Sequence, residues 1–189
     1  MLPNLAVGVS GGGTNLDAIL AYGLPVRLVF ADRPCPAIER VRDRIATVVI
    51  ERRPGGIPFN RHLHTLRTVA ALRNNNIDVV ALAGYMTVFD RCIFDYYGGH
   101  MLNTHPSLLP AFPGAHAVSD ALAYGVKIVG CTVHLVIPEV DAGPILAQAA
   151  VPVEEGDTEV VLHERIKITA EHSLYPRTIE RFMHQKFDI

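Results

Sequence analysis

The chain has 189 residues, of which 49% are hydrophobic and 19% are charged, with a formal net charge of −2. This composition is typical of one soluble domain with a full hydrophobic core, and we expect that domain to span 1–189. The chain is not basic enough to suggest nucleic-acid binding, and it has no run of about 18 apolar residues that would cross a membrane. The N-terminus lacks the basic region of a signal peptide, and the three cysteines show no CxxC spacing. Both features favour a reducing cytoplasm over a disulfide framework or a thiolate zinc site.

The first half of the chain alternates between two patterns. Apolar runs of strand length occur at Leu5–Ser10, Val26–Ala31, Thr47–Ile50 and Val79–Ala83. Helical patterns fall between them at Thr14–Tyr22, roughly at 37–43, and at Asn60–Asn74. Continuous apolar runs are typical of strands buried on both faces. The order therefore predicts an α/β fold with a doubly wound, mostly parallel sheet, right-handed crossovers and helices on both faces.

The second half has a different pattern. A short strand should end before Pro106, because proline has no N–H to extend a ladder. The runs Ile128–Val136 and Ile145–Val153 are joined by PEVDAG, which is too short for a helical crossover, so they should pair antiparallel. A final helix is expected from about Glu159 to Phe182, with a kink or a break at Pro176.

A glycine-rich segment, GVSGGGTNLDAI at residues 8–19, runs from the first strand into the first helix. Glycines let a backbone approach a ligand closely, and N–H groups at a helix start attract anions. The segment is neither a Walker motif nor G-x-G-x-x-G, since no lysine follows and Leu16 replaces the third glycine. We interpret it as a phosphate cradle with Thr14 and Asn15 as side-chain donors. The competing interpretation is a turn without a ligand, with Thr14 as a simple helix cap.

The same residues satisfy G-x-S-x-G, the nucleophile elbow of α/β-hydrolases, with Ser10 as the nucleophile. An elbow normally follows earlier strands, one of whose loops supplies an oxyanion donor. Ser10 has no such strands before it, and no supporting motif supplies the acid and histidine. A serine hydrolase is therefore only a remote alternative.

Polar residues gather around the predicted strand end at NTHPSLLP, residues 103–110. Side chains at i and i+2 of a strand share a face, so Asn103 and His105 point one way and Thr104 the other. Asp141, in the loop EVDAGPI, can orient an imidazole and favour its imidazolium form. His134 precedes this loop and would support the cluster. A strand-end histidine and a turn aspartate without catalytic roles are the competing interpretation.

Nine histidines are many for this length. His62 and His64 lie two apart in a predicted helix and so point to different faces. The other histidines have no recognised ligand spacing, and we expect no metal.

Three segments, SGGGTN, NTHPSLLPAFPG and GPILAQAAVPVEEGD, together resemble the folate-dependent formyltransferase family. The resemblance covers nearly the whole chain. It implies a single Rossmann-like domain with a seven-stranded sheet. It also implies that 10-formyltetrahydrofolate donates a formyl group to the amine of glycinamide ribonucleotide (GAR), a step of purine biosynthesis in the cytoplasm.

The resemblance also implies roles for residues at matching positions. The catalytic residues would be Asn103, His105 and Asp141, with the first two stabilising a tetrahedral oxyanion and Asp141 orienting His105 and a proton-relaying water. GAR would be bound by Gly12, Gly13, Thr14, Asn15 and Glu171. The folate would be bound by Met86, Thr87, Val88, Phe89, Asn103, Val140 and Asp141. Relatives more often have arginine at the position of Thr87, so a folate or oligomer contact is expected to differ here.

Other members of the family remain alternatives. The formyltransferase that acts on initiator tRNA has a second domain and usually an arginine before the loop glycine, where this chain has Pro113. The formyltetrahydrofolate hydrolase has a regulatory domain and typically a second histidine at the position of Thr104. A phosphosugar-binding module without catalysis is the alternative from another class. The expected partners are small molecules, with no nucleic acid or membrane, and the resemblance allows a homodimer.

Overall fold

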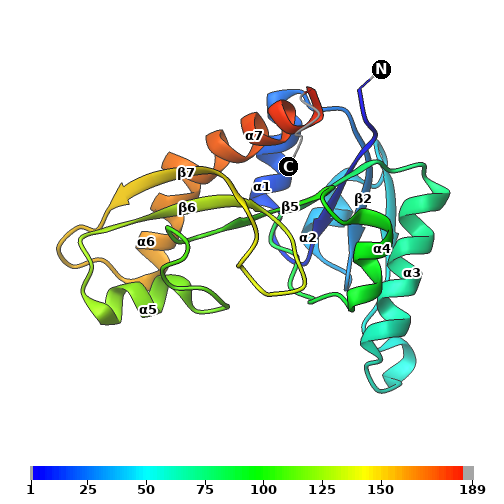
Figure 1. Ribbon diagram of the computed structural model, residues 1–189, viewed down its shortest axis with the longest axis horizontal. Coiled ribbons are helices and arrows are strands. Elements are labelled where there is room, and N and C mark those ends of the chain that lie inside the picture. The colour runs from blue at the N-terminus through cyan, green and yellow to red at the C-terminus, as the bar shows by residue number, and fades with distance from the viewer. Residues whose placement is uncertain (1, 185–189) are drawn as a thin grey trace. The chain divides into compact units, whose positions relative to one another are not determined.

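The computed structural model describes residues 2–184 of the chain. It is organised as two compact units, an N-terminal unit up to Met101 and a C-terminal unit from Leu102 onward (Figure 1).

The N-terminal unit contains the alternating elements that the apolar runs predict. Its strands are β1 (Leu5–Val9), β2 (Val26–Ala31), β3 (Ala46–Val49) and β4 (Val79–Leu82). Its helical segments are α1 (Thr14–Tyr22), α2 (Pro36–Val41), η1 (Pro54–Gly56), α3 (Arg61–Asn74), η2 (Arg91–Ile93) and α4 (Phe94–Tyr97). β1 pairs parallel with β2 and with β4, and β2 pairs parallel with β3. Every residue of β1 and β4 is buried, as expected for strands covered on both faces.

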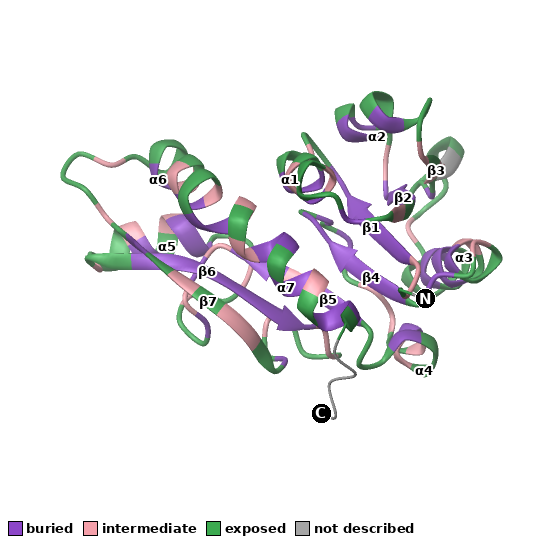
Figure 2. Ribbon diagram, turned by 90° about the horizontal axis from the view of Figure 1, so that it is seen from above, coloured by how far each residue is buried: buried purple, intermediate pink, exposed green. Residues whose placement is uncertain are grey.

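The helices of this unit cover both faces of its strands, with α1 and α2 on one side and α3 on the other (Figure 2). This follows from right-handed crossovers, because the chain moves outward through β2 and β3 and then returns past β1 to β4. The carboxyl ends of all four strands therefore share one edge, where α/β sheets bind their ligands.

The C-terminal unit is built on an antiparallel hairpin. Its elements are β5 (Met101–His105), α5 (Ala117–Tyr124), β6 (Ile128–Leu135), β7 (Ile145–Pro152), α6 (Glu159–Ile166), η3 (Lys167–Glu171) and α7 (His172–His184). β6 pairs antiparallel with both β5 and β7, which confirms the predicted hairpin. One apolar cluster joins α5, β6, β7, α6 and η3, through residues such as Val118, Cys131, Val151, Leu162 and Ala170.

The last helical region corrects one expectation. Pro176 lies inside α7 and does not divide it. The change of helix type comes earlier, in the π-helical turn Lys167–Glu171. Pro176 has no N–H to donate, so α7 continues past it with one backbone hydrogen bond fewer. The short helices α4 and α5 were not predicted from the sequence.

These elements confirm the predicted fold class, an α/β fold with a seven-stranded, mostly parallel sheet and helices on both faces. None of the helices within residues 2–184 combines the length and apolar composition that a membrane crossing requires.

Candidate active site

The strand β5 carries the polar residues of the candidate site, and its pairing with β6 explains how they meet. In the antiparallel register, Asn103 lies opposite His134, and His105 lies opposite Thr132. Directly opposed residues share a face of the sheet. The predicted common face of Asn103 and His105 therefore also carries His134, while Thr104 points to the face covered by helices.

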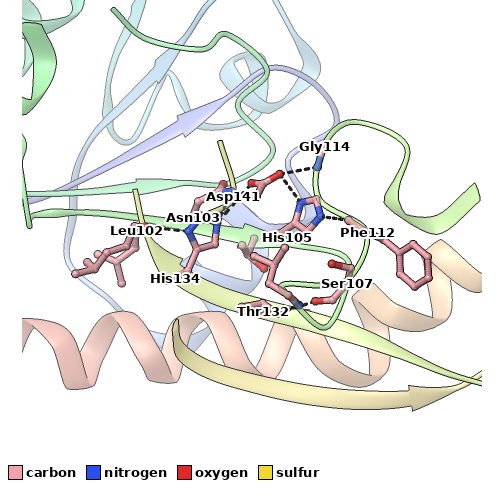
Figure 3. A network of polar contacts seen from close by, with 12 residues as sticks. Leu102, Asn103, His105, Ser107, Phe112, Gly114, Thr132, His134 and Asp141 are labelled. Atoms are coloured by element: carbon pink, nitrogen blue, oxygen red, sulfur yellow. Dashed lines mark hydrogen bonds and ion pairs between the residues drawn. The ribbon is translucent and has the colours of Figure 1, made fainter. Parts of the chain in front are cut away.

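His105 is buried, and both of its ring nitrogens lie near oxygen atoms (Figure 3). Nε2 is 2.9 Å from the carbonyl oxygen of Phe112, and Nδ1 is 3.5 Å from Oδ2 of Asp141. A carbonyl and a carboxylate can only accept hydrogen bonds. Nε2 therefore carries a hydrogen and donates it to Phe112, while Nδ1 lies at ion-pair distance from the Asp141 carboxylate.

Asp141 lies between two histidines and is held by its loop. Oδ2 accepts a hydrogen bond of 2.8 Å from the backbone N–H of Gly114, and Oδ1 is 3.6 Å from Nε2 of His134. Burial raises the pKa of this carboxyl, but the nearby His134 ring, the hydrogen bond from Gly114 and the charge of His105 together hold it below the ordinary value of 3.8. Asp141 is therefore a carboxylate at neutral pH.

The loop geometry that aims Asp141 is visible in its backbone. Asp141 has a φ of 53°, in the left-handed region that aspartate and asparagine tolerate better than most residues. A Cβ added to Gly143 would lie 1.8 Å from the carbonyl oxygen of Leu135, so only glycine lets the loop pass this close to β6. The segment DAG thus places the carboxylate over the strand that carries His134.

The orientation of Asn103 follows from His134. Nδ1 of His134 is 2.9 Å from the carbonyl of Leu135 and must donate to it, which leaves Nε2 as an acceptor in the neutral ring. The side-chain amide of Asn103 lies 3.2 Å from this Nε2 and donates one of its two hydrogens there. The supporting contact expected of His134 is thus present, and the second amide hydrogen of Asn103 can serve a ligand.

The loop after β5 is bonded to the hairpin at two residues. The hydroxyl of Thr132 donates to the carbonyl of Ser107 at 2.7 Å and accepts from the N–H of Leu109 at 3.0 Å. Ser107 in turn donates to the carbonyl of Ala111 at 2.6 Å. These bonds fix the segment leading to Phe112, the residue whose carbonyl contacts His105. Phe112 and Thr132 were not singled out from the sequence, because the contact joins segments far apart in the chain.

Glu171 lies on the helix-covered face of the C-terminal unit, in the π turn. Its carboxylate is buried and accepts a hydrogen bond of 3.0 Å from the hydroxyl of Thr104. Thr104 therefore has a polar partner of its own on the face opposite Asn103 and His105. π turns often occur at functional sites.

The glycine-rich loop of the N-terminal unit leads into α1 as predicted. Gly13 is the N-cap, with a φ of 75°, and no side chain caps the helix. An anion can take the place of such a cap at the N–H groups of the first turn. Arg40, which the sequence analysis did not identify, donates to the carbonyl of Gly12 and to the carboxylate of Asp17, so a cation borders this loop.

Residues 86–89 of the N-terminal unit divide between surface and interior. Met86 and Val88 are exposed and can provide apolar contacts for a flat ligand, and Phe89 stacks on Tyr85 with ring centroids 5.1 Å apart. The side chain of Thr87 is buried, and its hydroxyl donates to Asp32 at 2.6 Å. Val140, in the C-terminal unit, is exposed.

Ser10 does not have the surroundings of a nucleophile. Its hydroxyl accepts a hydrogen bond of 2.8 Å from the N–H of Met86 and is also bonded to the carboxylate of Asp32. A catalytic serine is instead activated by a base such as histidine. These contacts give Ser10 a structural role at the end of β1.

Three side chains of the N-terminal unit that are able to bind a metal ion lie together, namely His62, Asp90 and Cys92. Asp90 caps η2 by accepting from the N–H of Cys92, and it also contacts Nδ1 of His62 at 3.1 Å. Burial and the nearby Asp90 carboxylate raise the pKa of the Cys92 thiol, which disfavours the thiolate that a metal would need. The group therefore has a local structural explanation, and the expectation of no metal stays a prediction.

The chain belongs to the formyl transferase family, whose model matches residues 3–179. The phosphoribosylglycinamide formyltransferase of Mycobacterium tuberculosis is 43% identical over 173 residues, covering 87% of this chain and 78% of the relative. The enzyme of the same name from Bacillus subtilis is 35% identical, covering 96% and 95%. The crystal structure of glycinamide ribonucleotide transformylase 1 from Symbiobacterium toebii superposes with a TM-score of 0.90 at 40% identity, covering 97% of this chain and 88% of that chain.

Proposed function

We propose that the chain transfers the formyl group of 10-formyltetrahydrofolate to the amine of GAR, giving formyl-GAR in purine biosynthesis. The comparisons support this activity, since relatives and solved structures of that name match nearly the whole chain. The observation in the structure that carries the proposal is the group formed by Asn103, His105 and Asp141 on one face of β5.

The chemistry required is acyl transfer between two nitrogens. Attack of the GAR amine on the formyl carbon places negative charge on the formyl oxygen, and preorganised donors stabilise that oxyanion. Asn103 offers its second amide hydrogen. His105 offers Nδ1–H, because its Nε2–H is bonded to the carbonyl of Phe112. No covalent intermediate with the protein is needed.

Asp141 has two tasks in this proposal. Its negative charge 3.5 Å from Nδ1 favours the cationic form of His105, the stronger donor to an oxyanion. Its carboxylate also positions a water that carries a proton from the attacking amine toward the departing folate nitrogen. His134 supports both tasks by contacting Asn103 and Asp141.

The substrates are assigned to the predicted residues as part of the same proposal. Gly12, Gly13, Thr14 and Asn15 hold the phosphate of GAR, and Glu171 contacts its glycinamide part. Met86, Val88, Phe89 and Val140 form the apolar contacts of the folate, with Thr87 contributing through its backbone. Residues 1–189 act as one formyltransferase domain, which the match of the family model across 3–179 supports. A cytoplasmic location and a homodimer complete the proposal, and sedimentation of the purified protein measures the oligomeric state.

The deciding experiment measures formyl transfer to GAR, with a reaction that lacks the amine as control. We expect loss of 10-formyltetrahydrofolate only when GAR is present, with formyl-GAR appearing in equal amount. Consumption of the donor without GAR would instead indicate a formyltetrahydrofolate hydrolase. Binding of GAR without turnover would indicate a binding module.

The substitution Asn15→Ala tests the phosphate cradle. We expect the KM for GAR to rise about tenfold, because a donor to a charged phosphate is lost, while the KM for the folate stays within about twofold. Asn15 is a better choice than Gly13, since a Cβ on Gly13 would lie 2.5 Å from Cβ of Ala37 and disturb the contact with α2. Steady-state kinetics with each substrate varied give both values, and equal changes in the two KM values would contradict the assignment.

The substitution Ser10→Ala separates formyl transfer from serine hydrolysis. We expect the variant to keep most of its kcat, because no step uses a serine nucleophile. Its stability should fall, since the N–H of Met86 loses its acceptor. A loss of kcat as large as that of His105→Ala, together with labelling of the wild-type protein by a serine-reactive phosphonate, would favour the hydrolase.

A further inference from the structure

The N-terminal unit contains a cavity that none of the assigned residues lines. It has a volume of about 440 Å³ and lies where the chain leaves β2 and β3, and its lining includes Asp32, Arg33, Glu51, Arg52, Arg53 and Phe59. The carboxyl ends of strands are where open α/β sheets bind ligands. Three arginines in one such cavity favour a ligand with negative charge.

The buried carboxylate of Asp32 holds two of these arginines in place. Its side chain is 0% exposed and accepts two hydrogen bonds of 3.0 Å from Arg33, one at each carboxylate oxygen. Nε of Arg52 lies 3.4 Å from the same carboxylate. The side chains of Arg33 and Arg52 are 41% and 39% exposed, so a buried anion holds two partly exposed cations at the cavity. A cation already held in place loses little entropy when it binds an oxyanion.

The remaining lining adds a cation and an aromatic wall. Arg53 is exposed, and its side chain has no ion pair within the described part of the chain, so its charge is available to a ligand. Arg52 contacts Asp32 through Nε, which leaves its two terminal nitrogens for another acceptor. Phe59, whose ring packs edge-on against His64, closes one side of the cavity. Counting Asp32 and Glu51 against three arginines leaves the lining with one net positive charge.

The cavity adjoins the segment proposed to bind the folate. The carboxylate of Asp32 that anchors the arginines also accepts the hydrogen bond from Thr87, and Met86 and Val88 lie exposed on either side of that threonine. Because the hydroxyl of Thr87 is turned inward to Asp32, it cannot meet an anionic group of a folate that lies on Met86 and Val88. The cations nearest along this network are Arg33, Arg52 and Arg53.

A folate ends in a glutamate, or a chain of glutamates, joined through an amide to an aromatic ring. We infer that the arginine cavity binds the glutamate carboxylates of the folate donor, with Arg52 and Arg53 as the contacting cations and Arg33 neutralising Asp32. This inference rests on the proposed function, since it takes 10-formyltetrahydrofolate as the donor. It makes the cavity the site that distinguishes folates by the length of their glutamate chain.

The test compares three donors, 10-formyltetrahydropteroate without glutamate, the monoglutamate and the triglutamate. In Arg53→Ala we expect the KM of the monoglutamate to rise about tenfold and that of the triglutamate to rise further, because a charge-assisted hydrogen bond is lost. The pteroate should be affected less than about twofold. We expect Arg52→Ala to change the KM values of the three donors in the same way as Arg53→Ala. Glu51→Gln, which removes a negative charge from the same lining, should lower the KM of both glutamate-bearing donors.

The matched control is Arg42→Ala, since Arg42 is also an exposed arginine of the N-terminal unit but is absent from the cavity lining and pairs with Glu39. It should leave all three KM values unchanged. Equilibrium binding of tetrahydrofolate and of tetrahydropteroate, followed by calorimetry, gives a readout without turnover. Thermal unfolding of each variant checks that the fold is retained, and Arg53→Ala keeps the test valid if Arg52→Ala disturbs Asp32.

The outcomes separate this inference from the proposed function. If the wild-type protein formylates GAR but Arg53→Ala and Arg52→Ala change the KM values of all three donors by the same factor, or not at all, the inference is wrong and the function stands. If the two variants instead raise the KM for GAR, the cavity binds phosphate and the inference is also wrong. If the wild-type protein neither binds tetrahydrofolate nor transfers formyl groups, the proposed function fails and the inference fails with it.

Discussion

Asp141→Asn should slow formyl transfer by about a hundredfold or more, a loss of at least ~2.7 kcal/mol of transition-state stabilisation. Asparagine keeps the shape of the side chain and tolerates the positive φ of this position, so the loop should be retained. What is lost is the charge that favours the cationic form of His105 and the base that positions the relay water. Both substrates should still bind within a few-fold, so the effect should appear in kcat.

Single-turnover kinetics on the wild-type protein and the variant measure the chemical step directly. The pH dependence provides a second check. Because the pKa of Asp141 lies below 3.8, its carboxylate is fully charged throughout the neutral range, and its contribution is lost only when the pH falls through that low pKa. The wild-type rate should therefore show no titration of this group between about pH 5 and pH 8. Full activity in the variant would leave Asp141 as a turn residue.

Asp32→Asn should destabilise the N-terminal unit by roughly 2 kcal/mol at neutral pH. Burial raises the pKa of Asp32, but hydrogen bonds from Arg33, Thr87 and Ser10 outweigh burial and lower it from 3.8 to about 2. A carboxyl with a lower pKa in the folded state stabilises the fold when it is ionised, and the interval between 3.8 and about 2 corresponds to the stated energy. The amide keeps the shape but cannot neutralise the arginines.

The size of this destabilisation depends on the pH. The stabilisation is complete above the unfolded value of 3.8 and is lost as the pH falls toward about 2, because the folded state must then take up a proton. Denaturant unfolding at several pH values should show the difference between wild-type and variant shrinking over this interval. Asp17→Asn is the control, since Asp17 pairs with Arg40 at the surface with 51% of its side chain exposed. Parallel pH curves for wild type and Asp32→Asn would contradict the role given to Asp32.

Much of the fold follows from short-range patterns in the sequence. Thr14–Tyr22 and Val26–Ala31 are found with the predicted bounds, and the antiparallel hairpin follows from a loop too short for a crossover. These features depend on hydrophobic periodicity and chain connectivity, which are local. The π turn at Lys167–Glu171 was missed and the break expected at Pro176 was wrong, because a helix packed on a hairpin can retain a proline that local rules would exclude.

The candidate site also combines features that the local sequence predicts with features that depend on the tertiary structure. The two-residue period of a strand was enough to place Asn103 and His105 on one face and Thr104 on the other, and both placements are confirmed by their partners. Which residues contact Asn103 and His105 depends on the register between β5 and β6. The pairing of Asn103 with His134 comes from strand alignment, and the carbonyl of Phe112 reaches His105 only through a loop bonded to β6. The roles assigned to these residues in catalysis stay predictions until they are measured.

Residue types and their spacing along the chain thus determined the strands, the helices α1 to α3, the glycine-rich helix start and the face on which the polar pair of β5 lies. Only the tertiary structure decided that Thr87 is turned inward to Asp32 and that arginines from two strand ends border one cavity. The physical reason is the range of the interactions. A side chain's face depends on its near neighbours along the chain, whereas the protonation, orientation and partners of a buried carboxylate depend on groups that folding brings together from distant segments.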